Sequence, residues 1–319
     1  MTESEMLKKV FTFGLIILLS FELVVAKNSS EFESNIFFEF YNERSELTYT
    51  SNSLGDDLVS GSGCNPSENV AIIVHGWLES CKTTWIQEMI PNLNDHRGGC
   101  IICMNYSAYS KTFDYFGLVS EFSFIDDVLV NKLHQLVQEE FIPEKIFIFG
   151  FSFGGQLALE AGRRFGKKLI GRIDACEAAG PGFDSNRTYS MENPMESAKF
   201  VQCIHSSYDK GTTKRNCHQN WHLGNCGLTQ IAAGPYPLGS HGLCPYFYNS
   251  AFTNPFHAIP KPENCPTSDR LPPIIPDGMA MGYVFNDLSL VNETVGYDYY
   301  AHTFKRKPYH LDIDLFNKN

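Results

Sequence analysis

The chain has no cluster of basic residues, no zinc-binding spacing and no internal repeat. Lys and Arg number 25 against 36 Asp and Glu, which gives the 319 residues a formal net charge of −11. Such an acidic chain is a poor candidate for binding nucleic acid, or for binding anionic membranes through charge alone. The cysteines lack the paired CxxC spacing of a zinc site. His205, His218 and His222 lie close together but without a His-Glu-x-x-His motif, so we expect no metal and no cofactor.

Long apolar runs are also scarce. The strongest is at the N-terminus, where Lys8 and Lys9 precede a run of about ten apolar residues and Val24-Val25-Ala26 offers small residues for cleavage. This run is too short to span a bilayer and is typical of a secretory signal. We therefore expect residues 1–26 to be a signal peptide of a secreted protein. Because that segment contains two Lys and three Glu, the mature chain would carry a charge of about −10.

The cysteine content fits an oxidising, extracellular compartment. All ten cysteines follow the expected signal, and sequons at Asn28, Asn186 and Asn292 fit surface loops of a secreted glycoprotein. Cys103 and Cys176 lie within or at the end of apparent core strands, so we expect both to be free. The favoured pairs are Cys81–Cys100 and Cys203–Cys217. The remaining connectivity cannot be derived from the sequence.

Short apolar runs alternate with helical patterns along residues 70–176. Val70–Val74 is a continuous apolar run, typical of a strand covered on both faces. Further strands are expected at 101–104, 145–149 and 169–176, and helices at 83–93, 118–136 and 153–165. This alternation predicts an α/β fold with a mainly parallel central sheet, helices on both faces, and ligand chemistry at the carboxyl ends of the strands. Past residue 205 the abundance of Gly, Pro, His and Cys predicts long disulfide-tied loops.

A serine stands at the apex of a predicted strand–turn–helix. Gly150-Phe151-Ser152-Phe153-Gly154 lies between an apolar strand and an expected helix. The two glycines lack the Cβ that a strained turn would exclude, and the helix N-terminus favours developing negative charge. Ser152 is therefore the predicted nucleophile.

A serine nucleophile needs a base and an acid that orients it, and in this fold class the chain order is serine, acid, histidine. Glu177 and Asp174 are the two candidate acids and His241 is the candidate base. The backbone N–H groups of Trp77 and Phe153 could form an oxyanion hole.

Four motifs in order carry a family resemblance. They are Ile-Ile-Val-His-Gly-Trp at 72–77, Gly-Phe-Ser-Phe-Gly-Gly at 150–155, the Arg172–Pro181 stretch, and Ser-His-Gly-Leu-Cys-Pro-Tyr-Phe-Tyr at 240–248. Together they resemble the animal pancreatic-lipase family, nearest its insect secreted lipases and phospholipases, over roughly residues 65–305. The resemblance implies an α/β-hydrolase fold and a secreted carboxylic ester hydrolase that meets its lipid ester substrate at a membrane or lipid interface.

The resemblance also implies a domain organisation. We expect a single lipase-type domain over residues 27–319 without the C-terminal β-sandwich of pancreatic lipase, so dependence on colipase is not implied. No oligomeric state follows from the sequence.

The chain departs from the family pattern at the acid. The family has aspartate where this chain has Glu177, which we favour over Asp174 because period two points Asp174 to the opposite strand face. Leu243 and Cys244 stand where the family usually has Arg and Ser. The altered acid keeps open an alternative function, a catalytically weak lipid-binding or yolk-like storage protein.

The segment that carries the family's lid is short here. Only residues 227–240 separate Cys226 from His241, and they are uncharged and interrupted by Pro235 and Pro237. The family comparison then favours phospholipid, cleaved at the sn-1 ester, or small lipid esters over emulsified triglyceride. One point stays open: Trp77, Phe151 and Phe153 either pack in the core or line an acyl groove. His75 is expected to brace the oxyanion loop and not to act as a base.

Overall fold

The computed structural model describes most of the chain, namely residues 30–52, 58–185, 193–235, 239–268, 270–290 and 294–310. The expected signal peptide, residues 1–26, and the sequons at Asn28, Asn186 and Asn292 lie outside these ranges. Within the described ranges, no helix has the length and apolar content needed to cross a bilayer.

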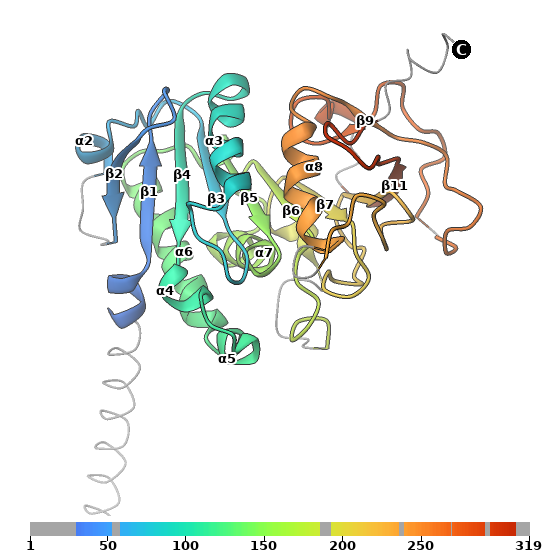
Figure 1. Cartoon of the computed structure of the whole chain (residues 1–319). Helices are drawn as coiled ribbons and strands as arrows, with labels where there is room; N and C mark the ends of the chain where they lie inside the picture. The colour runs from blue at the N-terminus through green and yellow to red at the C-terminus, as the bar shows by residue number, and fades with distance from the viewer. Residues whose placement is uncertain are drawn as a thin grey trace, which may run out of the picture.

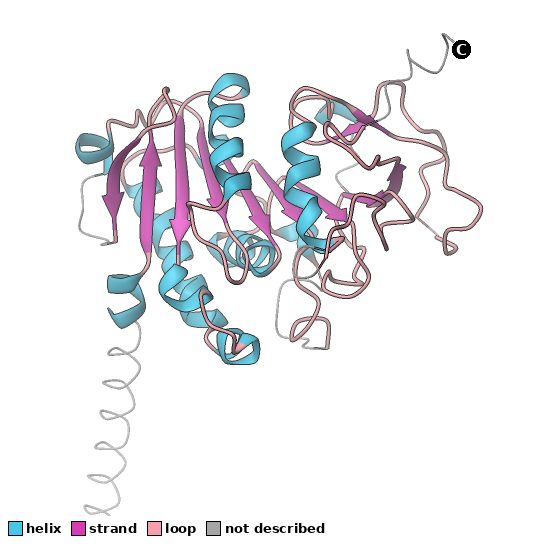
Figure 2. Cartoon of the chain, viewed as in Figure 1, coloured by secondary structure: helices cyan, strands magenta, loops and turns pink. Residues whose placement is uncertain are grey.

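The described residues form one large central sheet (Figures 1 and 2). Its strands are β1 Phe37–Tyr41, β2 Leu47–Ser51, β3 Val70–Val74, β4 Cys100–Asn105, β5 Ile146–Phe151, β6 Arg172–Cys176, β7 Phe200–His205, β8 Gln219–Leu223 and β11 Tyr297–Ala301. The strand order is β11-β8-β7-β6-β5-β3-β4-β1-β2. All neighbours from β11 to β4 are parallel, whereas β1 is antiparallel to β4 and β2. A separate small sheet pairs β9 Phe256–His257 with β10 Ala280–Met281.

Helices cover both faces of the central sheet. They are α2 Leu58–Ser62, α3 Thr84–His96, α4 Ser107–Ser110, α5 Tyr115–Ser120, α6 Phe122–Gln138, α7 Phe153–Phe165 and α8 Cys244–Ser250. Alternate strand residues point to opposite faces. Ile72 therefore packs in the core beneath α6 and α7, and its neighbour Ile73 packs in the core beneath α3 and α8. This confirms the predicted fold class, an α/β architecture with a mainly parallel sheet.

The sequence predicted the first half of the sheet better than the second. The strands and helices expected between residues 70 and 176 are present, and the expected long helix is two helices, α5 and α6, that meet at Glu121. Past residue 205 the prediction of long disulfide-tied loops was incomplete. Cys226–Cys265 joins two loop segments, but β8, α8 and β11 also lie there. β8 reads Gln-Asn-Trp-His-Leu and is buried along its whole length. Its polar side chains hide it from a search for apolar runs.

All ten cysteines lie within the described residues and form disulfides. The pairs are Cys64–Cys100, Cys81–Cys103, Cys176–Cys244, Cys203–Cys217 and Cys226–Cys265. Cys203–Cys217 was predicted correctly. The Cys81–Cys100 pairing was wrong because Cys100 and Cys103, three residues apart on β4, face opposite sides of the sheet. The expectation of free thiols at Cys103 and Cys176 was also wrong, because Cys81 in a loop reaches Cys103 and Cys244 at the start of α8 reaches Cys176.

Candidate active site

Ser152 occupies the turn between β5 and α7. Its backbone has φ +56° and ψ −119°, a conformation that costs a non-glycine residue about 1–3 kcal/mol. The flanking glycines make this turn possible. A Cβ on Gly154 would lie 2.4 Å from the carbonyl oxygen of Val74, and one on Gly150 would lie 2.3 Å from the carbonyl oxygen of Gly154. Side chains are therefore excluded at both positions.

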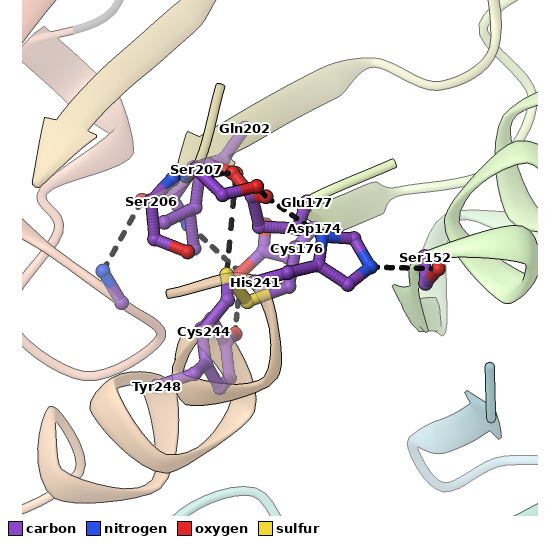
Figure 3. Close-up of a disulfide and its surroundings, with 12 residues drawn as sticks. Ser152, Asp174, Cys176, Glu177, Gln202, Ser206, Ser207, His241, Cys244 and Tyr248 are labelled. Carbon is purple, nitrogen blue, oxygen red and sulfur yellow. Dashed lines mark hydrogen bonds and ion pairs between the residues drawn. A yellow bond between two sulfur atoms is a disulfide. The ribbon is translucent and has the colours of Figure 1, made fainter. Parts of the chain in front are cut away.

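His241 lies between Ser152 and Glu177, as Figure 3 shows. Its Nε2 is 2.9 Å from the Ser152 hydroxyl oxygen, and its Nδ1 is 2.8 Å from Glu177 Oε2. A carboxylate only accepts hydrogen bonds, so Nδ1 carries the proton and the Nε2 lone pair faces the serine hydroxyl. The three side chains come from segments far apart in sequence and are buried, with Ser152 8%, His241 7% and Glu177 0% exposed.

The Glu177 carboxylate is fixed at the end of β6. It accepts hydrogen bonds from the backbone N–H groups of Ser206 and Ser207 and from the Ser207 hydroxyl. The backbone of Glu177 is left-handed, with φ +50°. A Cβ on Gly211 would lie 2.6 Å from Glu177 Oε2. The absence of a side chain at Gly211 therefore leaves room for the additional methylene of glutamate.

Asp174, the alternative acid, belongs to a different buried network. Its carboxylate receives two hydrogen bonds from the Arg172 guanidinium, at 2.8 and 2.7 Å, and one at 2.9 Å from Gln202 Nε2. The Tyr248 hydroxyl donates a further hydrogen bond to it. These partners occupy the carboxylate on the α8 side of the sheet, and His241 is not among them.

The loop after β3 carries one of the two expected oxyanion donors. Among the described residues, neither the N–H of Trp77 nor that of Phe153 donates a hydrogen bond. The loop is held by the Glu79 carboxylate, which accepts from the Gly76 N–H and from Trp85 Nε1, both at 2.8 Å. Burial raises the pKa of Glu79. Both carboxylate oxygens thus tie the oxyanion loop to itself and to α3.

His75 is part of the same loop but not of the hydrogen-bonded chain. It is fully buried, its ring stacks on Tyr106 at 4.2 Å, and its Nδ1–H donates to the carbonyl oxygen of Gly76 at 2.9 Å. Burial lowers the pKa of His75 to about 4, so the ring is neutral. These contacts agree with the expectation that His75 braces the loop.

A cavity of about 390 Å³ opens onto Ser152. Its lining residues are Trp77, Leu78, Glu79, Tyr115, Phe116, Phe151, Ser152, Ala179, Pro181, Lys210, His241 and Gly242. Trp77 and Phe151 therefore line a groove, whereas Phe153 is buried in the core against Phe122 and Phe183. None of the described residues of the short 227–240 segment lines the cavity.

His205, His218 and His222, which lie close together in the sequence, do not share one set of contacts in the structure. His205 and His222 have ring centroids 5.5 Å apart, and His218 Nδ1 accepts a hydrogen bond from the Val201 N–H. In the part of the chain that the structure describes, no group of three or more His, Cys, Asp or Glu side chains could hold a metal ion.

The lipase family model matches residues 19–225, well over half of the chain. The chain belongs to the lipase family. The match includes Trp77, Ser152 and Glu177, and His241 lies beyond it.

Individual relatives are distant from this lipase-family chain. Pancreatic lipase-related protein 2 of Cavia porcellus is 28% identical over 154 residues, which cover 46% of this chain and 34% of that protein. Pancreatic triacylglycerol lipase of Homo sapiens is 26% identical over 174 residues, covering 54% and 37%. The chain spans about a third of the length of these curated relatives. Among solved structures, Est1E from Butyrivibrio proteoclasticus matches with a TM-score of 0.34 and 10% identity, covering 53% of this chain and 72% of that one.

Sequence reasoning missed several residues that shape the site. Glu79 could have been noticed as an acid just beyond the end of β3, at the edge of the sheet where ligand chemistry is expected. Ser206 and Ser207 likewise follow β7. The space at Gly211 and the Cys176–Cys244 disulfide arise only from contacts between distant segments, so no local pattern signals them.

Proposed function

We propose that this protein is a secreted lipase-family serine hydrolase that cleaves carboxylic esters of lipids through an acyl-enzyme. The observation that carries the proposal is the hydrogen-bonded chain from Ser152 through His241 to Glu177. In this scheme Ser152 is the nucleophile, His241 is the general base and then the general acid, and Glu177 keeps the proton on His241 Nδ1.

The reaction would proceed in two halves. Ser152 Oγ attacks the ester carbonyl carbon while its proton moves to His241 Nε2, and the resulting oxyanion is stabilised by the N–H groups of Trp77 and Phe153. Collapse of this intermediate breaks the bond to the alcohol, which departs with the proton from Nε2. The acyl group remains bound to Ser152. Water then attacks the acyl carbonyl carbon while its proton moves to His241 Nε2. Collapse of the second intermediate breaks the bond to Ser152 Oγ, which takes the proton back from Nε2, and the carboxylic acid leaves.

The cavity supports a lipid substrate, because its aromatic and aliphatic lining suits an acyl chain and it reaches the Ser152 hydroxyl. Glu79 and Lys210 add charged groups to the lining. Together with the short 227–240 segment, they favour a substrate with a polar head group, such as a phospholipid cleaved at the sn-1 ester, over an acylglycerol. Five disulfides support secretion.

One observation favours a second candidate. The acid is glutamate where the family has aspartate, and a misplaced acid would leave a catalytically weak lipid-binding or yolk-like storage protein on the same fold. The space at Gly211 favours the hydrolase, since it lets the longer side chain reach His241 at hydrogen-bond distance.

Labelling with a fluorophosphonate probe separates the two candidates. The wild-type protein should be labelled and should hydrolyse a short-chain p-nitrophenyl ester, and Ser152→Ala should abolish both signals while its circular dichroism spectrum is unchanged. Ser67→Ala, at an exposed serine elsewhere on the surface, is the matched control and should retain both. Absence of labelling in the folded wild-type protein would support the storage function.

A further inference from the structure

Helix α8 is attached to strand β6 at two points, both visible in Figure 3. Cys244 forms a disulfide with Cys176, with the two Cα atoms 5.9 Å apart, and the Tyr248 hydroxyl donates to the Asp174 carboxylate. Cys244 and Tyr248 are four residues apart and therefore lie on one face of the helix. Asp174 and Cys176 are two residues apart and share one face of the strand. The attachment is therefore a matched pair of contacts, one covalent and one hydrogen-bonded.

The covalent contact is the one nearer the hydrogen-bonded chain. Cys176 directly precedes Glu177, and Cys244 follows His241 by three residues. Both cysteines are fully buried, at 0% exposure. Of the disulfides among the described residues, this is the one that joins the segment carrying Glu177 to the segment carrying His241.

Hydrogen bonds also fix the segment that carries His241. On the N-terminal side of His241, the Ser240 carbonyl oxygen accepts from the Ser206 hydroxyl and the Ser240 hydroxyl accepts from the Gln230 N–H, both at 2.9 Å. Glu177 itself is in a left-handed conformation that its surroundings must maintain. A long side chain on a strained backbone needs a fixed partner if its carboxylate is to meet one ring nitrogen.

We propose that the Cys176–Cys244 disulfide is a positioning element of the active site. It holds the end of β6 and the start of α8 at the separation at which Glu177 Oε2 meets His241 Nδ1. This inference rests on the proposed ester hydrolysis. The two cysteines contact no reacting atom, and their effect passes through the contact between acid and histidine.

Two double variants remove the disulfide, Cys176→Ala/Cys244→Ser and the volume-conserving Cys176→Val/Cys244→Ala. The matched control is Cys64→Ala/Cys100→Ala, which removes a disulfide at the amino end of β4, away from Ser152. Turnover of a soluble p-nitrophenyl ester is measured well below the melting temperature of each variant. We expect kcat to fall about 10- to 100-fold without Cys176–Cys244, with KM within about twofold of wild type. The control should melt earlier but keep its kcat.

A second measurement distinguishes positioning from general stabilisation. In a Glu177→Gln background, removal of the disulfide should change the rate of fluorophosphonate labelling by less than about twofold, because the contact it positions is already lost. A merely structural disulfide would lower the rate by the same factor in both backgrounds.

Several outcomes would overturn the proposal. The first is a wild-type kcat without the disulfide, and the second is an equal loss of kcat in the Cys64/Cys100 control. The third is a labelling rate that falls by the same factor in the wild-type and Glu177→Gln backgrounds. The fourth is failure of both double variants to fold, which would make the disulfide a requirement of the fold. If the wild-type protein itself shows no Ser152-dependent turnover, the proposed function and this inference both fall. If the wild type turns over and the disulfide-free variants do so equally, this inference alone is wrong.

Discussion

The two halves of the central sheet are stabilised in different ways. In β3, β4 and β5 the buried side chains are almost all apolar, and regular helices cover them. In β8 the buried side chains include Gln219, Asn220 and His222, and the first two form hydrogen bonds with polar partners. Gln219, for example, exchanges hydrogen bonds with the Asn286 side-chain amide at 3.1 and 2.6 Å. The first half is held by non-directional burial and the second by specific contacts.

The candidate site is divided along the same line. The first half supplies Ser152 and the oxyanion loop, and the second supplies His241 and the serines that fix the acid. Glu177 stands at the boundary, at the end of β6. Apolar packing tolerates small changes in volume, whereas a polar contact depends on distance and angle. Catalysis should therefore be more sensitive to small changes in the second half than in the first.

The largest expected effect tests which of the two β6 acids, Glu177 or Asp174, orients His241. Glu177→Gln should lower kcat by about 10⁴-fold, because an amide in this position stabilises the wrong tautomer of His241. Asp174→Asn should mainly lower the free energy of unfolding, by about 3–5 kcal/mol, because it leaves the buried Arg172 guanidinium without a counter-charge. Steady-state kinetics and thermal melts on both variants provide the measurement.

The reverse pattern would contradict this division of roles. If Asp174→Asn is inactive while fully folded and Glu177→Gln keeps its rate, Asp174 is the acid that orients His241 and the two roles are reversed. The Ser67→Ala protein serves again as the folded, active control.

The next effect concerns the space beside the acid. Gly211→Ala places a methyl group on Glu177 Oε2 and should displace the carboxylate, with a loss of about 100-fold in kcat, the cost typical of an error of about 1 Å. Glu177→Asp shortens the acid and should restore part of that rate in the Gly211→Ala background. Kinetics of the two single variants and the double variant form the test. If the loss of kcat in the double variant equals the product of the losses in the two single variants, the methyl group acts elsewhere.

The sequence predicted the apolar half of the sheet and its part of the site better than the polar half. Ser152 and the Trp77 loop were recognisable because strand, glycines and helix form one local pattern. His241 was predicted only through the family motif around it. Gly211, the partners of Glu177 and the Cys176–Cys244 pair were not predicted, because they depend on which distant segments meet across β6, β7 and α8. Polar strands such as β8 have no apolar period to reveal them.

A smaller effect is expected in the oxyanion loop, which belongs to the apolar half. Glu79→Ala removes the acceptor for the Gly76 N–H and for Trp85 Nε1. The loop keeps its hydrogen bond from the Leu78 N–H to the Ser110 carbonyl oxygen at 2.9 Å. The Trp77 N–H should therefore be held less firmly in position but should still reach the oxyanion. We expect kcat to fall about tenfold, less than the 10²–10³ that outright loss of an oxyanion donor costs.

Comparison with Glu79→Gln sharpens this prediction. The amide keeps one acceptor oxygen for two N–H donors, so its kcat should lie between wild type and Glu79→Ala. Equal kcat in all three proteins would show that the loop is held without Glu79.

The smallest expected effect is the response to a lipid interface, and it concerns the least regular part of the second half. None of the described residues of 227–240 lines the cavity that reaches Ser152, and we expect that no large lid has to move before substrate enters. The rate on a partly soluble ester should then rise smoothly through its solubility limit, with less than about a twofold step.

Phosphatidylcholine should be cleaved at the sn-1 ester at least as fast as long-chain triglyceride, because an open cavity leaves room for a head group beside His241. The measurement is initial rate against concentration for both lipids. A sharp jump at the aggregation point, with triglyceride strongly preferred, would mean that another segment covers the cavity and that the irregular half controls access as well as chemistry.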